Sequence, residues 1–288
     1  MRSRPLVTFF MLACGISWLL WMPLWLPSFG IAGLPVLPFH HALGALGPIM
    51  AAFIVTAMES GRAGCSDLLQ RMVLWHGRLL WIAVALFAPY ALLLVAVVAS
   101  SLFAGETFSF AGFGRSREFP QFSVLAFLAY NIVSFGYGEE VGWRGFALPR
   151  LQARHSAWVA SLQLTLGWAM WHLPLFLYRP GYTGMDALGV AGWLLSLLTG
   201  AVLLTWLYNE SRGSILIVAV FHATVDVAFT SSIATPPVVS IAGALITIWG
   251  IIVLLVAGAR HLSRRGKMIA LHGAQQQVAT PNVHSGHT

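Results

Sequence analysis

Eight long apolar segments alternate with short polar stretches along the chain. They cover approximately residues 5–27, 36–58, 79–103, 120–140, 157–178, 187–208, 214–234 and 237–259. Each segment is close to the roughly 20 helical residues that cross the ~30 Å hydrocarbon layer of a bilayer. A chain inside lipid must satisfy its own backbone hydrogen bonds, which favours helices. The pattern therefore predicts an all-α polytopic membrane bundle of about eight transmembrane helices.

Composition supports this class of protein. Of the 288 residues, 58% are hydrophobic and only 9% are charged, a balance that is far from that of soluble globular domains. The net charge of +7 would suit nucleic acid, but the basic residues lie in short turns and beside helix ends. That placement is typical of membrane proteins. We therefore expect membrane lipid around the protein and no nucleic-acid partner.

The distribution of lysine and arginine predicts the orientation. With the N-terminus inside, thirteen of the sixteen basic residues lie in inner segments, and only Arg115, Arg117 and Arg179 lie in outer loops. Because cytoplasmic loops are enriched in basic residues, both termini are predicted to be cytoplasmic. We accordingly expect a multi-pass protein of the cell membrane, and specifically of a bacterial inner membrane.

The stretches between the predicted spans are too short to form further domains. We expect one integral-membrane helical domain over residues 1–259, with a catalytic core at about 120–234. The outer loop at 105–120 carries no recognisable motif, and no function is assigned to it. Residues 260–288 are basic and then polar, which predicts a disordered cytoplasmic tail.

The candidate chemistry begins with adjacent carboxylates at the end of the fourth apolar segment. Glu140 and Arg144 are four residues apart, so a helix that continues past Glu140 pairs them on one face. Glu139 then points about 100° away, where it can face a cavity, bind water and act as a general base. Charge inside a membrane usually has a function. The alternative is that both carboxylates only close salt bridges at a helix end.

Glycines surround this motif. The four are Gly136, Gly138, Gly142 and Gly145. Because a glycine has no Cβ atom, we expect neighbouring helices to approach closely here.

Three more ionisable residues belong to the candidate site. His172 lies two residues before Pro174, which interrupts a helix, and His222 and Asp226 share one helical face. Because ionisable residues in spans face the bundle interior, we expect them to converge with Glu139. Either Asp226 orients His222 to stabilise an oxyanion, or the histidines, Asp226 and Glu139 bind a divalent metal such as zinc. Ordinary hydrogen bonds between helices are the third interpretation.

These residues, in this order and spacing, resemble the CPBP family of intramembrane endopeptidases. That family comprises the CAAX-processing and bacteriocin-processing proteases, also called abortive-infection proteins. The resemblance rests on E-E-x-x-x-R at 139–144, the histidine of the fifth segment and H-x-x-x-D at 222–226. It covers the fourth to seventh segments closely and the others in hydropathy only. It implies an endopeptidase that cleaves a prenylated C-terminal segment, or a leader or bacteriocin peptide, near the cytoplasmic membrane face.

The resemblance also implies a role for each position. Glu139 would activate water with His172, and Glu140 and Arg144 would hold the site together. His222, with residue 226, would stabilise the tetrahedral intermediate. The family is often described as metalloproteases, although a glutamate mechanism without metal has also been argued.

The sequence departs from the family pattern at two positions. Trp168 stands where the family often has phenylalanine, an exchange of one aromatic wedge for another. Asp226 stands where many members have asparagine, and an ionised carboxylate cannot donate a hydrogen bond to an oxyanion. Asp226 must therefore be protonated, orient His222 or bind a metal.

Two functions outside proteolysis remain open. A transporter would use the same polar cluster as a binding site, and a scaffold would bind a membrane partner without catalysis. A transporter of this kind is usually built from inverted repeats with interrupted helices, and no such repeat is found in the sequence.

His172 and Glu139 are predicted to lie at different depths in the membrane, although both belong to the candidate site. His172 follows Ala157 by 15 residues, which is about 22 Å of helix. Glu139 lies at the end of its apolar segment and is expected to be shallower.

Overall fold

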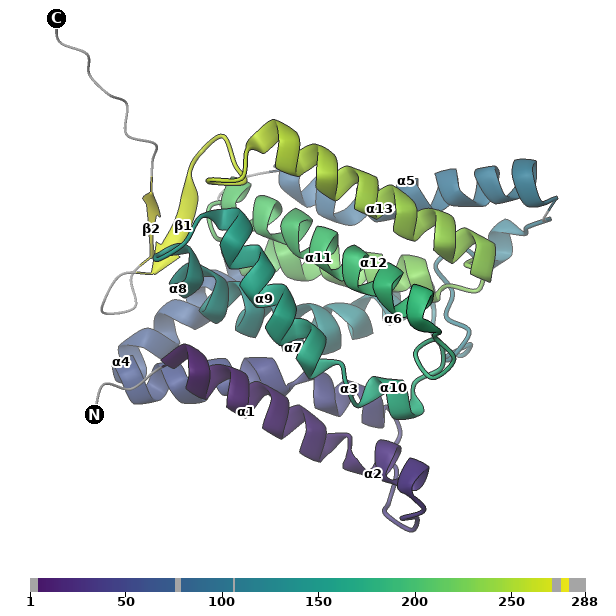
Figure 1. Cartoon of the computed structure of the whole chain (residues 1–288), viewed down its shortest axis with the longest axis horizontal. Coiled ribbons are helices and arrows are strands. Elements are labelled where there is room, and N and C mark those ends of the chain that lie inside the picture. The colour runs from purple at the N-terminus through teal and green to yellow at the C-terminus, as the bar shows by residue number, and fades with distance from the viewer. Residues whose placement is uncertain (1–4, 76–78, 106, 271–275, 280–288) are drawn as a thin grey trace, which may run out of the picture.

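The computed structural model describes residues 5–75, 79–105, 107–270 and 276–279. In chain order the elements are α1 (Pro5–Leu20), α2 (Met22–Trp25), η1 (Leu26–Phe29), α3 (His40–Ala45), α4 (Gly47–Val73), α5 (Leu79–Ala104), η2 (Phe110–Gly112), α6 (Val124–Asn131), η3 (Ile132–Tyr137), α7 (Gly138–Glu140), η4 (Val141–Ala147), α8 (Leu148–Gln152), α9 (Ala157–Trp171), α10 (Leu175–Tyr178), α11 (Ala187–Glu210), α12 (Ile215–Thr230), α13 (Pro236–Ala257), β1 (Lys267–Ala270) and β2 (Gln276–Ala279). Figure 1 shows the long helices running between a left end, which carries β1 and β2, and a right end, near α10.

Every apolar segment predicted from the sequence contains helix, so the all-α membrane class is confirmed, apart from one short hairpin. In the described part of the chain, four helices are long and apolar enough to cross a membrane: His40–Val73, Leu79–Phe103, Ala187–Glu210 and Pro236–Ala257. A fifth is obtained when α1 and Met22–Phe29, bent by 57°, are taken together. The number of eight spans and the cytoplasmic location of both termini stay predictions.

The helix that carries the glutamates extends well past them. Helical structure runs without a break from Val124 to Gln152, through the π-helical segments η3 and η4. Gln152 follows Glu139 by 13 residues, which corresponds to about 20 Å. That distance matches the ~22 Å that separates His172 from the start of α9. The expectation that Glu139 is shallower than His172 is therefore wrong, because the helix does not end at the glutamates.

Glycines beside the site bring neighbouring helices into close contact, as predicted. A Cβ atom on Gly142 would lie 2.6 Å from the Pro48 Cβ atom of α4. On another side of the same helix, a Cβ atom on Gly136 would lie 2.5 Å from the Ala219 carbonyl oxygen of α12. Both distances are far shorter than van der Waals contact. The helix of Glu139 is thus fixed against α4 and α12 by backbone contact.

We expect Gly142→Ala to lower the melting temperature, because overpacking a tight contact costs about 1–3 kcal/mol. The matched control is Gly243→Ala in α13, where an added Cβ atom meets nothing within 4 Å. That control gains helix propensity of about 1 kcal/mol. Thermal unfolding of both variants in one detergent measures the difference. Equal melting temperatures would contradict the tight contact.

Residues 260–270 fold back onto the bundle, which differs from the predicted disordered tail. Glu210, at the end of α11, accepts a hydrogen bond of 2.9 Å from the Ser263 hydroxyl group. Gln152 Nε2 donates a bond of 2.8 Å to the Met268 carbonyl oxygen, and β1 pairs antiparallel with β2. Buried polar groups at the helix ends therefore order this segment. The rest of the predicted tail, apart from β2, lies outside the described residues.

Candidate active site

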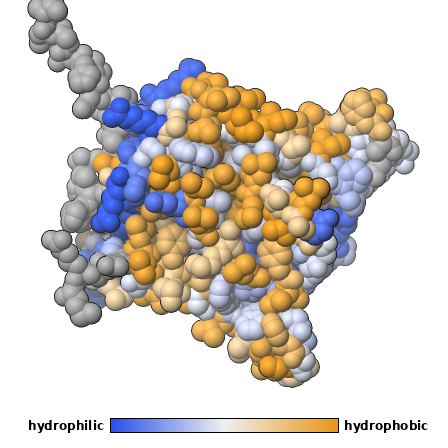
Figure 2. Space-filling model, in the orientation of Figure 1, coloured by the Kyte–Doolittle hydropathy of each residue, from blue (hydrophilic) through white to orange (hydrophobic). Residues whose placement is uncertain are grey.

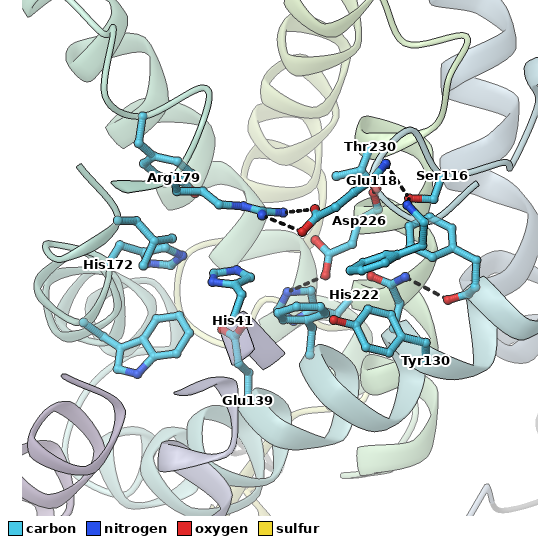
Figure 3. A pocket seen from close by; sticks show the side chains of 17 residues that line it. His41, Ser116, Glu118, Tyr130, Glu139, His172, Arg179, His222, Asp226 and Thr230 are labelled. Atoms are coloured by element: carbon cyan, nitrogen blue, oxygen red, sulfur yellow. Dashed lines mark hydrogen bonds and ion pairs between the residues drawn. The ribbon is translucent and has the colours of Figure 1, made fainter. Parts of the chain in front are cut away.

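A cavity of about 180 Å³ lies between α3, α6, α9 and α12, with room for several water molecules. The predicted site residues that line it are Glu139, His172, His222 and Asp226 (Figure 3). Glu140 and Arg144 lie behind the cavity, in the core, with side chains that are 0% exposed. All six predicted residues are therefore brought into one region, four at the cavity wall and two in support.

Glu139 is clamped by two indole rings. Trp168 Nε1 donates a hydrogen bond of 2.7 Å to its Oε2 atom, and Trp143 Nε1 donates one of 3.2 Å to the same atom. Among the described residues, the hydrogen bonds to this carboxylate all end on Oε2. The carboxylate is thereby held in one orientation, with Oε1 available to a water molecule in the cavity.

Glu140 joins the two helices that carry the site. Its Oε1 atom accepts hydrogen bonds from Arg144 Nη1 at 2.9 Å and from His222 Nδ1 at 2.7 Å. The ion pair predicted from the four-residue spacing is therefore present. The Arg144 guanidinium group also lies 4.8 Å from the centre of the Trp168 ring. This buried pair connects the helix of Glu139 to α9 and α12.

His222 lies between two carboxylates. Because an ionised carboxylate only accepts hydrogen bonds, its Nδ1 atom carries the hydrogen that bonds to Glu140. Nε2 is then directed at the cavity, where Asp226 Oδ2 lies 3.7 Å away. That distance is typical of an ion pair and longer than a hydrogen bond. Asp226 thus pairs electrostatically with His222 when the imidazole is charged.

The tautomer of His172 follows from its backbone contact. Nδ1 lies 2.7 Å from the Trp168 carbonyl oxygen, and a carbonyl oxygen only accepts, so Nδ1 carries the hydrogen. In the neutral ring, Nε2 is therefore an acceptor. The ring stacks on Tyr182 with 6.1 Å between centroids. Helix α9 ends at Trp171, so the break expected near Pro174 is present.

The cavity also has residues that the sequence analysis missed. His41 lines the wall, and it carries the same signal that marked His172, a histidine within an apolar segment. Glu118 and Arg179 close the rim through two hydrogen bonds of 3.0 and 2.7 Å. Glu118 belongs to the outer loop to which no function was assigned, so that assignment was incomplete. Because Glu118 and Arg179 are 61 positions apart, no local sequence pattern predicts their pairing, which is seen only in the tertiary structure.

The Trp168 indole also donates a hydrogen bond to Glu139, a contact that the sequence did not indicate. We expect Trp168→Phe to keep the aromatic packing but to remove the 2.7 Å bond to Glu139. Hydrogen bonds to charged groups contribute about 1.5–3 kcal/mol, so kcat/KM should fall roughly 10-fold or more. Steady-state cleavage kinetics measure this. Trp158→Phe, on the same helix, is the control. Equal kinetics in both variants would show that the indole N–H does not position the carboxylate.

Glu139, His172, His222 and Asp226 are also the candidate metal ligands. In the part of the chain that the structure describes, no group of three or more His, Cys, Asp or Glu side chains is placed to hold a metal ion. In addition, Oε2 of Glu139 and the Nδ1 atoms of His172 and His222 already have protein partners. The described side chains therefore do not form a metal centre, and a divalent metal at this site stays a prediction.

Comparisons with known proteins support an intramembrane endopeptidase. Residues 120–228, which include all six predicted site residues, match the family described as Type II CAAX prenyl endopeptidase Rce1-like. A CAAX prenyl protease 2 of Methanococcus maripaludis is 28% identical over 192 residues, which is 64% of this chain and 68% of that protein. Both matches support the CPBP family of CAAX-type intramembrane endopeptidases that the sequence motifs resemble.

Proposed function

We propose that the protein hydrolyses a peptide bond within the membrane, with Glu139 as the general base and a water molecule as the nucleophile. The observation that carries the proposal is a carboxylate clamped through one oxygen by Trp143 and Trp168 at the wall of a cavity shared with two histidines. A fixed carboxylate whose other oxygen faces the cavity can orient a water molecule and take its proton.

The proposed reaction begins with two acceptor atoms that bind one water molecule. Water is held between Oε1 of Glu139 and Nε2 of His172, both of which can accept its hydrogens. Glu139 takes one proton as the water oxygen forms a bond to the substrate carbonyl carbon. The same proton then passes to the leaving nitrogen as the C–N bond breaks.

His222 stabilises the oxyanion in this proposal. Its Nδ1 hydrogen is committed to Glu140, so a proton on Nε2 is the donor directed at the cavity. The 3.7 Å separation supports a role for Asp226 in orienting and charge-pairing His222, rather than as an oxyanion donor. Preorganised donors of this kind typically raise kcat by a factor of about 10²–10³. Arg144 fixes Glu140 from behind.

The substrate is a peptide or protein segment that reaches the membrane. The relative from Methanococcus is named a CAAX prenyl protease, which supports a prenylated C-terminal segment. A leader or bacteriocin peptide is the second candidate, because the 180 Å³ cavity itself has no feature that demands an isoprenoid chain.

The proposal is tested with the full chain purified in detergent. Farnesylated C-terminal peptides, the same peptides without the lipid, and leader-type peptides are incubated with it and analysed by mass spectrometry, with and without a chelator. We expect cleavage at one bond of at least one class, unaffected by the chelator. Loss of cleavage in chelator, restored by zinc, would contradict the metal-free step. No cleavage in any class would contradict the proposed function.

A further inference from the structure

The residues that form the exposed rim of the cavity lie at one end of the helix bundle. Glu118 comes from the loop before α6, Arg179 from the residue after α10, and Thr230 from the end of α12. The Arg179–Glu118 pair lies across the cavity from Glu139 in Figure 3. An isolated bridge between Ser116 and Ser231 ties the same loop to the end of α12. The cavity therefore leads from the glutamate toward the right end of the bundle in Figure 1.

The opposite end is strongly basic. Its described lysine and arginine residues are Arg62, Arg71, Arg150, Arg154, Arg212, Arg260, Arg264, Arg265 and Lys267. They connect the segments there: Arg150 pairs with Glu59 at 3.0 Å, and Lys267 donates to the His155 carbonyl oxygen at 2.6 Å. Figure 2 shows hydrophilic surface gathered along this left edge, with a broad apolar zone beside it. The rim end has only Arg115, Arg117 and Arg179 among its described residues.

The reacting groups lie far from the basic end. Glu139 is about 20 Å along its helix from Gln152, and His172 is about 22 Å from Ala157. Both distances from the basic end exceed half of a ~30 Å hydrocarbon layer. Two estimates on separate helices thus agree that the site lies nearer the rim than the basic end.

From these observations we propose that the active site opens to the non-cytoplasmic face of the membrane. Basic loops stay in the cytoplasm, so the end with nine described basic residues faces inward and the rim faces outward. The charge pattern of the sequence predicts two cytoplasmic termini, and the family resemblance implies cleavage near the cytoplasmic face. The structure makes these two expectations incompatible, and the charge distribution favours the first.

The inference rests on the proposed function and names its substrate class. The substrate is a polypeptide segment that is exported or exposed on the non-cytoplasmic side, entering past Arg179 and Glu118. A tail attached to the cytoplasmic leaflet could not reach Glu139 by this route. The class of reaction that must supply such a substrate is therefore export across, or insertion into, the membrane.

Sidedness is tested without reference to activity. Cys14 and Cys65 are replaced by alanine, and single cysteines are introduced as Thr183→Cys near the rim and Ala153→Cys at the basic end, both at exposed positions. Intact cells of a bacterial host that express the full chain are treated with a membrane-impermeant maleimide. We expect Thr183→Cys to label in intact cells, and Ala153→Cys to label only after permeabilisation. The reverse pattern, or labelling of both in intact cells, would overturn the inference.

A second arm separates this inference from the proposed function. In proteoliposomes with the Thr183→Cys variant, the rate of cleavage of an added soluble peptide should rise in proportion to the fraction of molecules that the maleimide labels from outside. A rate that instead follows outside labelling of Ala153→Cys would overturn the sidedness while leaving the protease intact. Cleavage in detergent but no labelling difference would do the same.

Discussion

Replacing Glu139 with glutamine is expected to reduce kcat/KM by about 10²–10⁴, the usual contribution of a general base. The amide oxygen of glutamine can still accept the hydrogen bonds that Trp143 and Trp168 donate to the carboxylate. The amide cannot take a proton from water at neutral pH. The variant should therefore unfold at nearly the same temperature as the wild type and lose only turnover. Cleavage kinetics and thermal unfolding in the same detergent measure both quantities.

The control for this variant is Glu59→Gln. Glu59 pairs with Arg150 at the basic end of the bundle, far from the cavity, and its side chain is 25% exposed. Exposed ion pairs contribute little to stability, so both turnover and melting temperature should stay close to wild type. If Glu139→Gln and Glu59→Gln cleaved peptide equally well, the general base would have to be another group.

Removal of Arg144 is expected to cause the largest loss of stability. Arg144→Met leaves the buried Glu140 carboxylate with only His222 as a partner, and breaking a buried ion pair costs about 3–5 kcal/mol. The methionine retains apolar contact with the Trp168 ring. Thermal unfolding in detergent should show a clear decrease, and activity should fall with it because Glu140 also holds His222.

A double variant distinguishes charge burial from simple loss of packing. Glu140→Gln combined with Arg144→Met removes both charges, and replacement of a whole buried pair is often close to neutral. We expect the double variant to be more stable than Arg144→Met alone. If the two substitutions were additive, the effect of Arg144 would come from packing and not from its charge.

Spacing along the chain predicted part of the site well. The four-residue separation of Glu140 and Arg144 was enough to predict their ion pair. The glycines predicted that neighbouring helices, which are α4 and α12 in the structure, approach the helix of Glu139 closely. These features depend on one helix and its period. The extent of that helix was harder to predict, because Glu140 and Arg144 resemble the polar end of a span. In the structure, the π-helical segment η4 continues the helix to Ala147, and α8 continues it to Gln152.

Other features depend on contacts between distant segments. The 3.7 Å separation of His222 and Asp226 is local, but the bond from His222 to Glu140 joins residues 82 positions apart. Nothing in the pattern of apolar positions selects one such pair from many. The same holds for Glu118 and Arg179, which lie in loops without regular structure. The direction in which the cavity opens could be read only once these loops were placed.

The most direct test of the central claim is peptide hydrolysis in H₂¹⁸O, followed by mass spectrometry of both fragments. The wild type is predicted to cut one bond and to place one ¹⁸O atom in the new carboxyl group, whereas Glu139→Gln is predicted to release fragments about 10²–10⁴ times more slowly. Equal fragment yields from the two proteins, or intact peptide with both, would contradict a glutamate-dependent endopeptidase.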